Sequence, residues 1–225
     1  YIFTIILINI KLYLSITKLA QIPDKVLIIL EKFTEKYIMN YYTIKELQTE
    51  LDSQDNVKKF LLNMIKSEYG YGFIPEYHQD IKNMDTYYLD PEGNNFYMAI
   101  NHETGKIIGT IGIRAYDKNF PFFDNVYDSK TTASIWRVFV SKKLRRNGIA
   151  STLVRQAEEF CRVKGYEKIY LHTHKNVAGS LDFWISNGYH IVMDTENHLK
   201  TVHMEKEICD TTSIPDSSKL LVLQE

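Results

Sequence analysis

The sequence predicts a single α+β domain that begins near Asn40. Short segments in which apolar and polar residues alternate recur from there to Ile208, and this period of two is typical of strands. Between them lie segments whose apolar residues are three and four apart, as on one face of a helix. The 225 residues are 44% hydrophobic and 24% charged, which is ordinary for a globular chain able to bury a sizeable core.

Net charge and cysteine content narrow the classes of function. The formal charge of −1 argues against nucleic-acid binding by bulk electrostatics. The two cysteines, Cys161 and Cys209, are far apart in the sequence and lack the spacing of a zinc site. They predict neither a metal centre nor a disulfide framework, and they favour a reducing compartment, which we expect to be the cytoplasm.

Residues 1–38 form an apolar N-terminal segment with a composition of its own. Its uncharged run, residues 1–10, is shorter than the roughly 20 residues that span a membrane. Lys11 and Lys18 interrupt the rest of the segment, and no basic region precedes the run as in a signal peptide. Three interpretations stay open: one or two helices packed on the domain, translated sequence upstream of a true start at Met39, or a membrane anchor.

The first part of the domain predicts a strand, a long helix and a short helix. Alternation favours a strand over Tyr41 to Leu47, and helical spacing of apolar residues favours a helix from Asn56 to Tyr69. We expect Ser53 or Asp55 to cap that helix, and the glycines directly after it to end it. A short helix is predicted from Pro75 to Ile81, with the proline in its first turn.

The middle of the domain predicts a β-hairpin. Its strands are Phe96 to Asn101 and Ile107 to Tyr116, joined by a polar connection that contains a glycine. Gly109 and Gly112 weaken the second strand unless another element packs closely against it. A polar and aromatic loop is predicted over residues 117–130.

The last part alternates strands and helices and ends in a polar tail, residues 210–225. The predicted helices end at glycines or at an Asn-Gly pair. The predicted strands are Ala133–Val140, Lys168–Thr173, Tyr189–Met193 and Val202–Ile208, and the predicted helices are Ile149–Val163 and Val177–Ser186.

The turn before the helix at Ile149 has the composition of an anion site. The first N–H groups of a helix lack intrahelical partners and carry partial positive charge. Gly148 lets a ligand approach the backbone, and the small residues Ala150 and Ser151 leave space for it. Four cations surround the turn: Lys142, Lys143, Arg145 and Arg146. A phosphate-bearing ligand is expected; the alternatives are a solvated turn, a nuclear-targeting patch or a simple strand-to-helix turn.

Three segments together resemble the GNAT superfamily of acyl-CoA-dependent N-acetyltransferases. Arg145 to Ala150 is similar to its Arg/Gln-x-x-Gly-x-Gly/Ala signature, and Arg137 to Val140 resembles its fourth strand. Ser180 to Tyr189 resembles its next motif, a helix with an aromatic pair that closes on glycine and an aromatic residue. The resemblance implies an N-acetyltransferase domain over residues 39–209, with a mixed, mostly antiparallel central sheet of six or seven strands and helices on both faces.

The resemblance also implies acetyl-CoA as co-substrate. Its pantetheine arm would lie between a splayed fourth and fifth strand, and its pyrophosphate on the N–H groups of the turn. Lys142 or Lys143 would reach the ribose phosphate. The implied cofactor-binding residues are Phe139, Val140, Arg145, Arg146, Asn147, Gly148, Ile149, Ala150, Ser151 and, at the start of the following helix, Asn176.

The implied reaction is attack of a primary amine on the thioester, with the Val140 backbone N–H near the oxyanion. The positions of the usual glutamate base and tyrosine acid hold Ser134 and Trp184, which cannot take those roles. Glu76 and His78 are the candidate bases that replace them, although His78 could instead cap or pack locally.

Two further histidines, His172 and His174, end the fifth strand near the expected acetyl group. A pair of this kind can bind a metal, but no third ligand is visible in the sequence, so no metal site is predicted. A proton relay is the other role open to the pair. Tyr189 and Trp184 are expected in the core.

The expected partner is a small-molecule amine. Four acidic residues in the predicted pocket segment favour a cationic amino compound or polyamine: Glu68, Glu76, Asp80 and Asp85. The alternatives are a non-catalytic acyl-CoA sensor, motivated by Ser134 and Trp184, and a nucleic-acid module that uses Lys142 to Arg146. We expect no nucleic-acid partner and no membrane contact unless residues 1–38 are an anchor; a homodimer is compatible with this interpretation.

Overall fold

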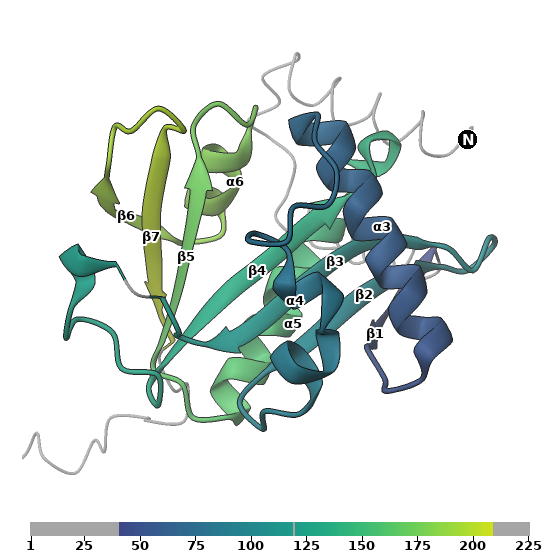
Figure 1. The fold of residues 1–225 in the computed structure, drawn as a ribbon, viewed down its shortest axis with the longest axis horizontal. Helices are drawn as coiled ribbons and strands as arrows, with labels where there is room; N and C mark the ends of the chain where they lie inside the picture. Colours follow the sequence, from purple (N-terminus) through teal and green to yellow (C-terminus); the bar gives the residue numbers. More distant parts are fainter. Residues whose placement is uncertain (1–40, 119, 209–225) are drawn as a thin grey trace, which may run out of the picture. The chain divides into compact units, whose positions relative to one another are not determined.

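One seven-stranded sheet with the order β1-β2-β3-β4-β5-β7-β6 organises the domain (Figure 1). The computed structural model describes residues 41–118 and 120–208. The strands are β1 Tyr42–Glu46, β2 Asn95–Asn101, β3 Ile107–Ala115, β4 Thr132–Val140, β5 Lys168–His174, β6 His190–Asp194 and β7 Thr201–Glu207. All neighbours pair antiparallel except β4 and β5, which are parallel. The predicted mixed, mostly antiparallel sheet is confirmed.

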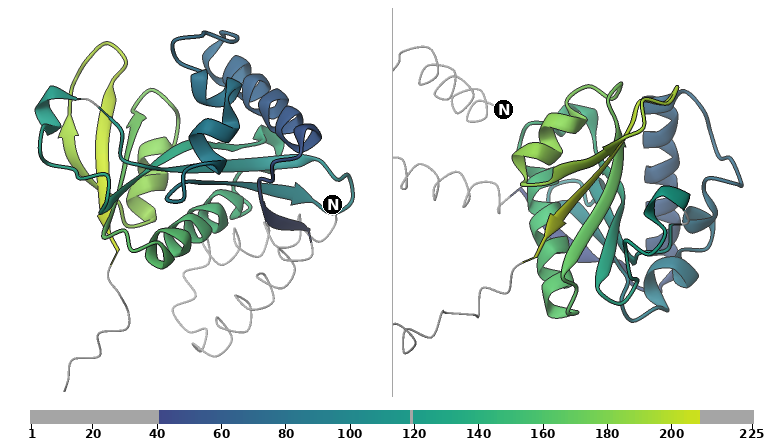
Figure 2. Two further views of the ribbon diagram at one scale, coloured as in Figure 1. Left: turned by 60° about the horizontal axis from the view of Figure 1, so that its bottom comes forward. Right: turned by 90° about the vertical axis from the view of Figure 1, so that its left-hand side faces the viewer.

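Helices cover both faces of this sheet, as predicted. Figure 2 shows α3 and α5 on opposite sides of it. The helices are α3 Leu51–Tyr69, α4 Gln79–Lys82, a π-helix η1 Asp85–Leu89, α5 Ile149–Val163 and α6 Ser180–Ser186, with short 3₁₀ turns η2 Pro121–Phe123 and η3 Lys142–Leu144. The apolar face of α5 is buried at Ile149, Leu153 and Ala157, as its spacing predicted. On the other face, α3, η1 and β2 share a core that contains Leu61, Tyr88 and Phe96.

The start of α3 differs from the prediction. The helix begins at Leu51, its N-cap is Glu50, and no side chain caps it, so the expected caps at Ser53 and Asp55 are wrong. A tertiary contact supports the extra turn, because the buried Gln54 side chain donates to Asp85 Oδ1 at 2.6 Å. The predicted end at Gly70 is confirmed, with φ 79° and an N–H that donates to Lys66 O.

Two other helix boundaries also need correction. The helix expected from Pro75 is only α4, which starts at Gln79, and residues 75–77 form a turn closed by the bond from Tyr77 N to Ile74 O. The helix expected from Val177 starts at Ser180, after Gly179 at φ 74°. In both segments a hydrogen-bonded turn replaces the predicted first helical turn.

The two β3 glycines are packed as closely as the sequence required. A Cβ on Gly109 would lie 3.1 Å from both Ile149 Cγ2 and Leu153 Cδ1. A Cβ on Gly112 would lie 2.6 Å from Tyr88 Cε1. The absence of side chains at these points therefore lets α5 approach one face of β3 and η1 the other.

The predictions for residues 1–38 and for the tail after residue 209 lie outside the described residues. Within residues 41–118 and 120–208, no helix has the length and apolar content needed to cross a membrane.

Candidate active site

The parallel strands β4 and β5 separate soon after they meet. Their pairing covers only Thr132–Ser134 with Lys168–Tyr170. Beyond these three residue pairs the strands diverge (Figure 1), and the β5 side of Ile135 to Val140 pairs with no described strand. The sheet thus contains the splay that the resemblance implied.

The helix α5 begins beside this splay with its first amides uncapped. Its N-cap is Gly148 at φ 77°, a conformation that glycine adopts without strain, and no side chain bonds to the first turn. The first intrahelical bond runs from Thr152 N to Gly148 O at 3.0 Å. The N–H groups of Ile149, Ala150 and Ser151 are therefore placed as anion donors.

Side chains of the turn before α5 bond to the end of α3. The sequence did not indicate these contacts. Lys142 Nζ donates to Ser67 O at 2.8 Å, and Arg145 Nη2 bonds to Glu68 Oε1 at 2.6 Å. Arg145 Nε also donates to Val140 O at 3.2 Å. Two of the four cations, Lys142 and Arg145, thus already bond to protein groups. Arg145 in particular links the turn before α5 to α3.

Arg146 is placed differently from Arg145. It makes no ion pair with a described residue, and its Nη2 lies 3.7 Å from the point where a Cβ on Gly179 would be. Its backbone is in the left-handed region at φ 66°. The side chain thus extends from the turn toward the start of α6, on the far side of the splay, and it is the arginine best placed for an anion there.

The remaining predicted cofactor residues have mixed placements. Phe139 packs against the core on the α3 face, and Val140 pairs with Gly109. Asn147 Nδ2 donates to Leu144 O at 3.0 Å and so stabilises the turn itself. The placement of Asn176 at the start of a helix is wrong, because it lies in an exposed turn before α6.

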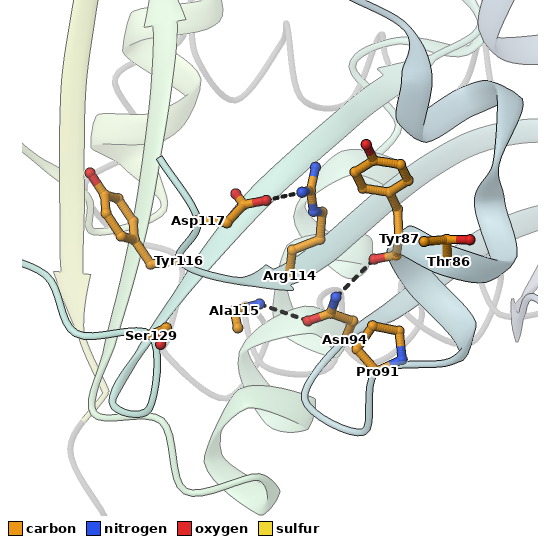
Figure 3. Close-up of a pocket in the computed structure, with 9 residues that line it drawn as sticks. All are labelled: Thr86, Tyr87, Pro91, Asn94, Arg114, Ala115, Tyr116, Asp117 and Ser129. Atoms are coloured by element: carbon orange, nitrogen blue, oxygen red, sulfur yellow. Dashed lines mark hydrogen bonds and ion pairs between the residues drawn. The ribbon is translucent and has the colours of Figure 1, made fainter. Parts of the chain in front are cut away.

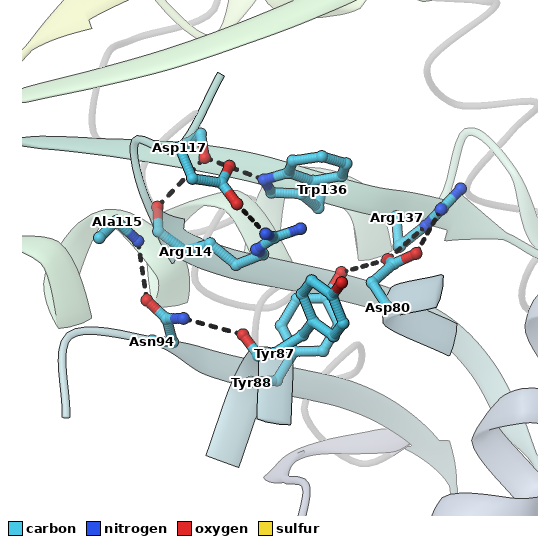
Figure 4. Close-up of polar contacts among 10 residues, drawn as sticks. Asp80, Tyr87, Tyr88, Asn94, Arg114, Ala115, Asp117, Trp136 and Arg137 are labelled. Atoms are coloured by element: carbon cyan, nitrogen blue, oxygen red, sulfur yellow. Dashed lines mark hydrogen bonds and ion pairs between the residues drawn. The ribbon is translucent and has the colours of Figure 1, made fainter. Parts of the chain in front are cut away.

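A bulge in β4 carries a buried ion pair on the α3 face. The β3–β4 register shifts between Thr110 and Gly112, and Arg137 has φ 50° there. Its guanidinium binds both carboxylate oxygens of Asp80, at 2.8 and 2.6 Å (Figure 4). It also donates to Tyr77 O. The Tyr88 hydroxyl donates to the same carboxylate at 2.6 Å.

The carboxylate of Asp80 stays charged although it is buried. Burial acts to raise its pKa, but the hydrogen bonds and charge of Arg137 and the hydrogen bond from Tyr88 outweigh burial and hold the pKa below its usual range. The pair therefore fixes α4 to the bulge of β4.

The acidic pocket expected for a polyamine is not formed. Glu68 is paired with Arg145, Asp80 with Arg137, and Asp85 accepts the hydrogen bond from Gln54. Of these four acidic residues, Glu76 is the one that is exposed and makes no hydrogen bond or ion pair with a described residue. Three of these four carboxylates thus hold the fold together, and the sequence could not show this because their partners are 31 to 77 positions away.

The structure supports the packing alternative for His78. The residue is buried, its Nδ1 accepts a hydrogen bond from Ile74 N at 2.8 Å, and its ring lies near those of Tyr71 and Phe73. Burial, followed by the charge of Arg137, lowers its pKa. In the neutral ring the proton is then on Nε2, so the lone pair needed by a base is already occupied.

Ser134 and Trp184 have the structural roles that their residue types suggest. Ser134 Oγ donates to Arg114 O at 3.2 Å and accepts from Trp136 Nε1 at 2.9 Å. Trp184 is buried against Tyr189, with ring centroids 5.1 Å apart, which confirms that both aromatic residues are in the core.

The sequence missed a group of cations around Trp136. The guanidinium carbon of Arg114 lies 4.3 Å from the centroid of the Trp136 ring, and Lys118 Nζ lies 3.1 Å from it. Arg114 lies near the end of β3 and Lys118 in the loop after it, so only the fold brings them to a β4 side chain. Their spacing in the sequence carries no motif that could have revealed them.

His172 lies near this group at the end of β5. Burial first, and then the charge of Lys118, lowers its pKa to about 3, so the ring is neutral. Among the described residues no cluster of His, Cys, Asp or Glu is arranged to hold a metal ion.

A surface hollow of about 450 Å³ lies beside Arg114 (Figure 3). Arg114 and Asp117 form an ion pair on its wall, and Asn94 links the Tyr87 carbonyl to the Ala115 amide, at 2.8 and 2.7 Å. None of its lining residues belongs to the turn before α5. The hollow is thus separate from the helix N-terminus.

Comparison with known proteins identifies the class that this fold and splay define. Residues 58–189 match the model of the acetyltransferase (GNAT) family. This match covers more than half of the chain, so the chain belongs to that family. An acetyltransferase of the family from Staphylococcus aureus aligns with a TM-score of 0.59 and 20% identity, over 74% of this chain and 100% of that one.

Curated relatives cover part of the chain only. Human N-acetylaspartate synthetase is 30% identical over 43% of this chain and 28% of its own length. N-acetyltransferase 8 from Rattus norvegicus is 30% identical over 50% of this chain and 46% of its own. The chain thus spans less than half of either relative. The paia N-acetyltransferase from Thermoplasma acidophilum, crystallised with coenzyme A, has a TM-score of 0.53 at 17% identity, over 73% of this chain and 99% of that one.

Proposed function

We propose that residues 39–209 transfer the acetyl group of acetyl-CoA to the primary amine of a small molecule. The observation that carries this proposal is the divergence of β4 from β5 beside the uncapped N-terminus of α5. An extended polar chain that ends in a diphosphate suits this arrangement, because the strand edge offers backbone partners and the helix start offers N–H donors. The coenzyme A complexes of fold relatives support the choice of an acyl-CoA.

The residues present fit acetyl-CoA, which supplies the activated thioester. Backbone groups of Phe139 and Val140 would pair with its amides, and the N–H groups from Gly148 to Ser151 would hold the pyrophosphate. Arg146 supplies charge without a carboxylate of the described residues to compete. Arg145 fastens the turn to α3 instead.

The reaction itself forms one bond and breaks one. The lone pair of the neutral amine forms a C–N bond with the thioester carbonyl carbon, the C–S bond breaks, and the proton that the nitrogen loses is balanced by the proton that the thiolate takes up. The Val140 N–H would stabilise the oxyanion between these steps. Holding both reactants at the splay supplies much of the rate, since effective molarities of about 10⁵ M or more are reached by well-oriented groups.

We assign removal of the ammonium proton to Glu76, directly or through one water. Its carboxylate is exposed and unengaged by the described residues, and it adjoins Tyr77, whose carbonyl contacts Arg137 on β4. A Glu76→Gln variant should lower kcat by about a hundredfold, the lower range for general base catalysis, with little change in KM. Steady-state kinetics over pH check this. The matched variant Glu92→Gln, at another exposed site, should leave kcat unchanged, and an unaltered kcat for Glu76→Gln would exclude the assignment.

The proposed function is tested by thiol release from acetyl-CoA across a panel of amines. A thermal shift with acetyl-CoA measures binding separately, and we expect Arg146→Ala to abolish the shift more fully than Arg145→Ala. Binding without turnover of any amine would favour the sensor alternative, which the engaged Ser134 and buried Trp184 keep open. Salt-dependent RNA or DNA binding without the thermal shift would favour the nucleic-acid alternative. The pairing of Lys142 and Arg145 with Glu68 argues against that alternative.

A further inference from the structure

We infer that the amine substrate carries a carboxylate and that the cations around Trp136 bind it, with Lys118 as the specificity residue. This inference rests on the proposed function, because it names the class of amine that the same site accepts. It replaces the polyamine expected from the sequence with an amino acid or a related amino acid derivative.

The first argument is the balance of charge on the α3 face of β4. Three cations lie together there, Arg114, Lys118 and Arg137. Two carboxylates oppose them among the described residues: Asp117 pairs with Arg114, and Asp80 with Arg137. Lys118 has no carboxylate partner of its own in that part of the chain. One positive charge is left over, and a single substrate carboxylate would balance it.

The second argument is the environment of the Lys118 ammonium. Its Nζ lies 3.1 Å from the centroid of the Trp136 ring, so an aromatic face has replaced part of its water shell. A desolvated cation that lacks a counter-ion is costly, and a bound anion relieves that cost. The ammonium is therefore poised for a carboxylate, whereas a cationic amine side chain would be repelled.

The third argument is position relative to the splay. Trp136 follows Ser134, the last β4 residue that pairs with β5, by two positions. His172, on β5, is close enough to Lys118 for that charge to lower its pKa. Lys118 thus lies over Trp136, where β4 has separated from β5, on the face of the sheet at which Trp136 packs against the core shared with α3 and η1. A carboxylate held there leaves the amine of the same molecule facing the gap.

The protonation of Lys118 supports this picture. Burial, followed by the charges of Arg114 and Arg137, lowers its pKa to about 7, and Asp80 opposes that shift. A bound carboxylate stabilises the charged form and raises the pKa, so affinity for an acid should fall as pH rises through about 7 and above. The titratable and charged groups that face Lys118 are Arg114, Arg137, Asp80, His172 and His203.

The experiment compares matched amines that differ only at the carboxylate. L-amino acids are assayed beside their carboxamides and the corresponding decarboxylated amines, with wild type, Lys118→Met, Lys118→Arg and the control Lys130→Met from the same loop. Wild type should have a kcat/KM at least tenfold higher for the acid. Lys118→Met should remove that preference by raising KM for the acid alone, Lys118→Arg should restore part of it, and Lys130→Met should match wild type.

A binding measurement separates this inference from the proposed function. Calorimetric titration of the acids in the presence of coenzyme A reports carboxylate binding without turnover. Acids that bind in a Lys118-dependent manner without acetylation would overturn the function and keep only the carboxylate-binding site at Lys118. Equal turnover of acids and carboxamides, or an equal loss for both in Lys118→Met, would overturn the inference and keep the function.

Discussion

Replacement of Gly148 by aspartate should abolish acetyl-CoA binding while leaving the fold intact. The residue is the N-cap of α5 at φ 77°, a conformation that aspartate tolerates better than most side chains. A carboxylate at an N-cap accepts the first N–H groups and stabilises the helix. In Gly148→Asp it would occupy the anion site and repel a diphosphate. We expect the dissociation constant of acetyl-CoA to rise at least a hundredfold, measured by calorimetry.

The opposite end of the same helix offers a control. Gly165 has φ 79°, with no atom near the position of a Cβ. Gly165→Asp introduces the same side chain in a similar backbone conformation, but at the negative end of the helix dipole and away from the splay. It should lower stability slightly and leave acetyl-CoA binding unchanged. Equal losses of binding in both variants would show that α5 does not hold the nucleotide.

Removal of the Arg137 guanidinium should destabilise the protein more than deletion of any exposed charge. Arg137→Met leaves the Asp80 carboxylate, 5% exposed, without its bidentate partner. The loss of one member of a buried pair costs about 3–5 kcal/mol, which denaturant unfolding can measure. Methionine at this position has the same backbone strain at φ 50° as arginine. The difference in free energy of unfolding between the two proteins therefore measures the contribution of the Arg137 side chain.

An exposed pair provides the comparison for Arg137. Arg162 and Glu159 lie on α5 with side chains 33% and 61% exposed, so Arg162→Met should cost under about 1 kcal/mol. The pH dependence gives a second check. Since the pKa of Asp80 is held below its usual 3.8, the stabilisation is present above that pH and is lost as pH falls below it. The gap between wild type and Arg137→Met should therefore narrow in acid, and a gap independent of pH would contradict the pairing.

Sequence periodicity predicted most of the fold because each element carries its own pattern. The range of α5, Ile149–Val163, was predicted to the residue, since its apolar face and its flanking glycines are local features. The starts of α3 and α6 were wrong by several residues, and the π-helix η1 was not predicted at all. These boundaries depend on tertiary hydrogen bonds, such as that from Gln54 to Asp85, which local propensity does not contain.

The backbone conformation of the candidate site could be predicted from the sequence, but the pairing of its charged side chains could not. The glycine turn follows from a local motif, the splay of the two strands was implied by the family resemblance, and the structure has both. The roles of Arg145, Asp80 and Lys118 depend on partners from other elements, so the sequence alone could not show that Glu68 and Asp80 are paired with arginines or that Lys118 lies over Trp136. The net charge of such a site depends on which side chains form ion pairs, and the fold decides which side chains meet.

The short contact between β4 and β5 also leaves free strand edges inside the sheet. Beyond Ser134 and Tyr170 the described sheet has two bare edges in its interior, where other sheets have only outer ones. A free edge is a template for a strand from another molecule. These two edges diverge, so an invading strand could follow one of them but could not bridge both. A foreign strand that pairs with one of these edges therefore leaves the other edge without a partner.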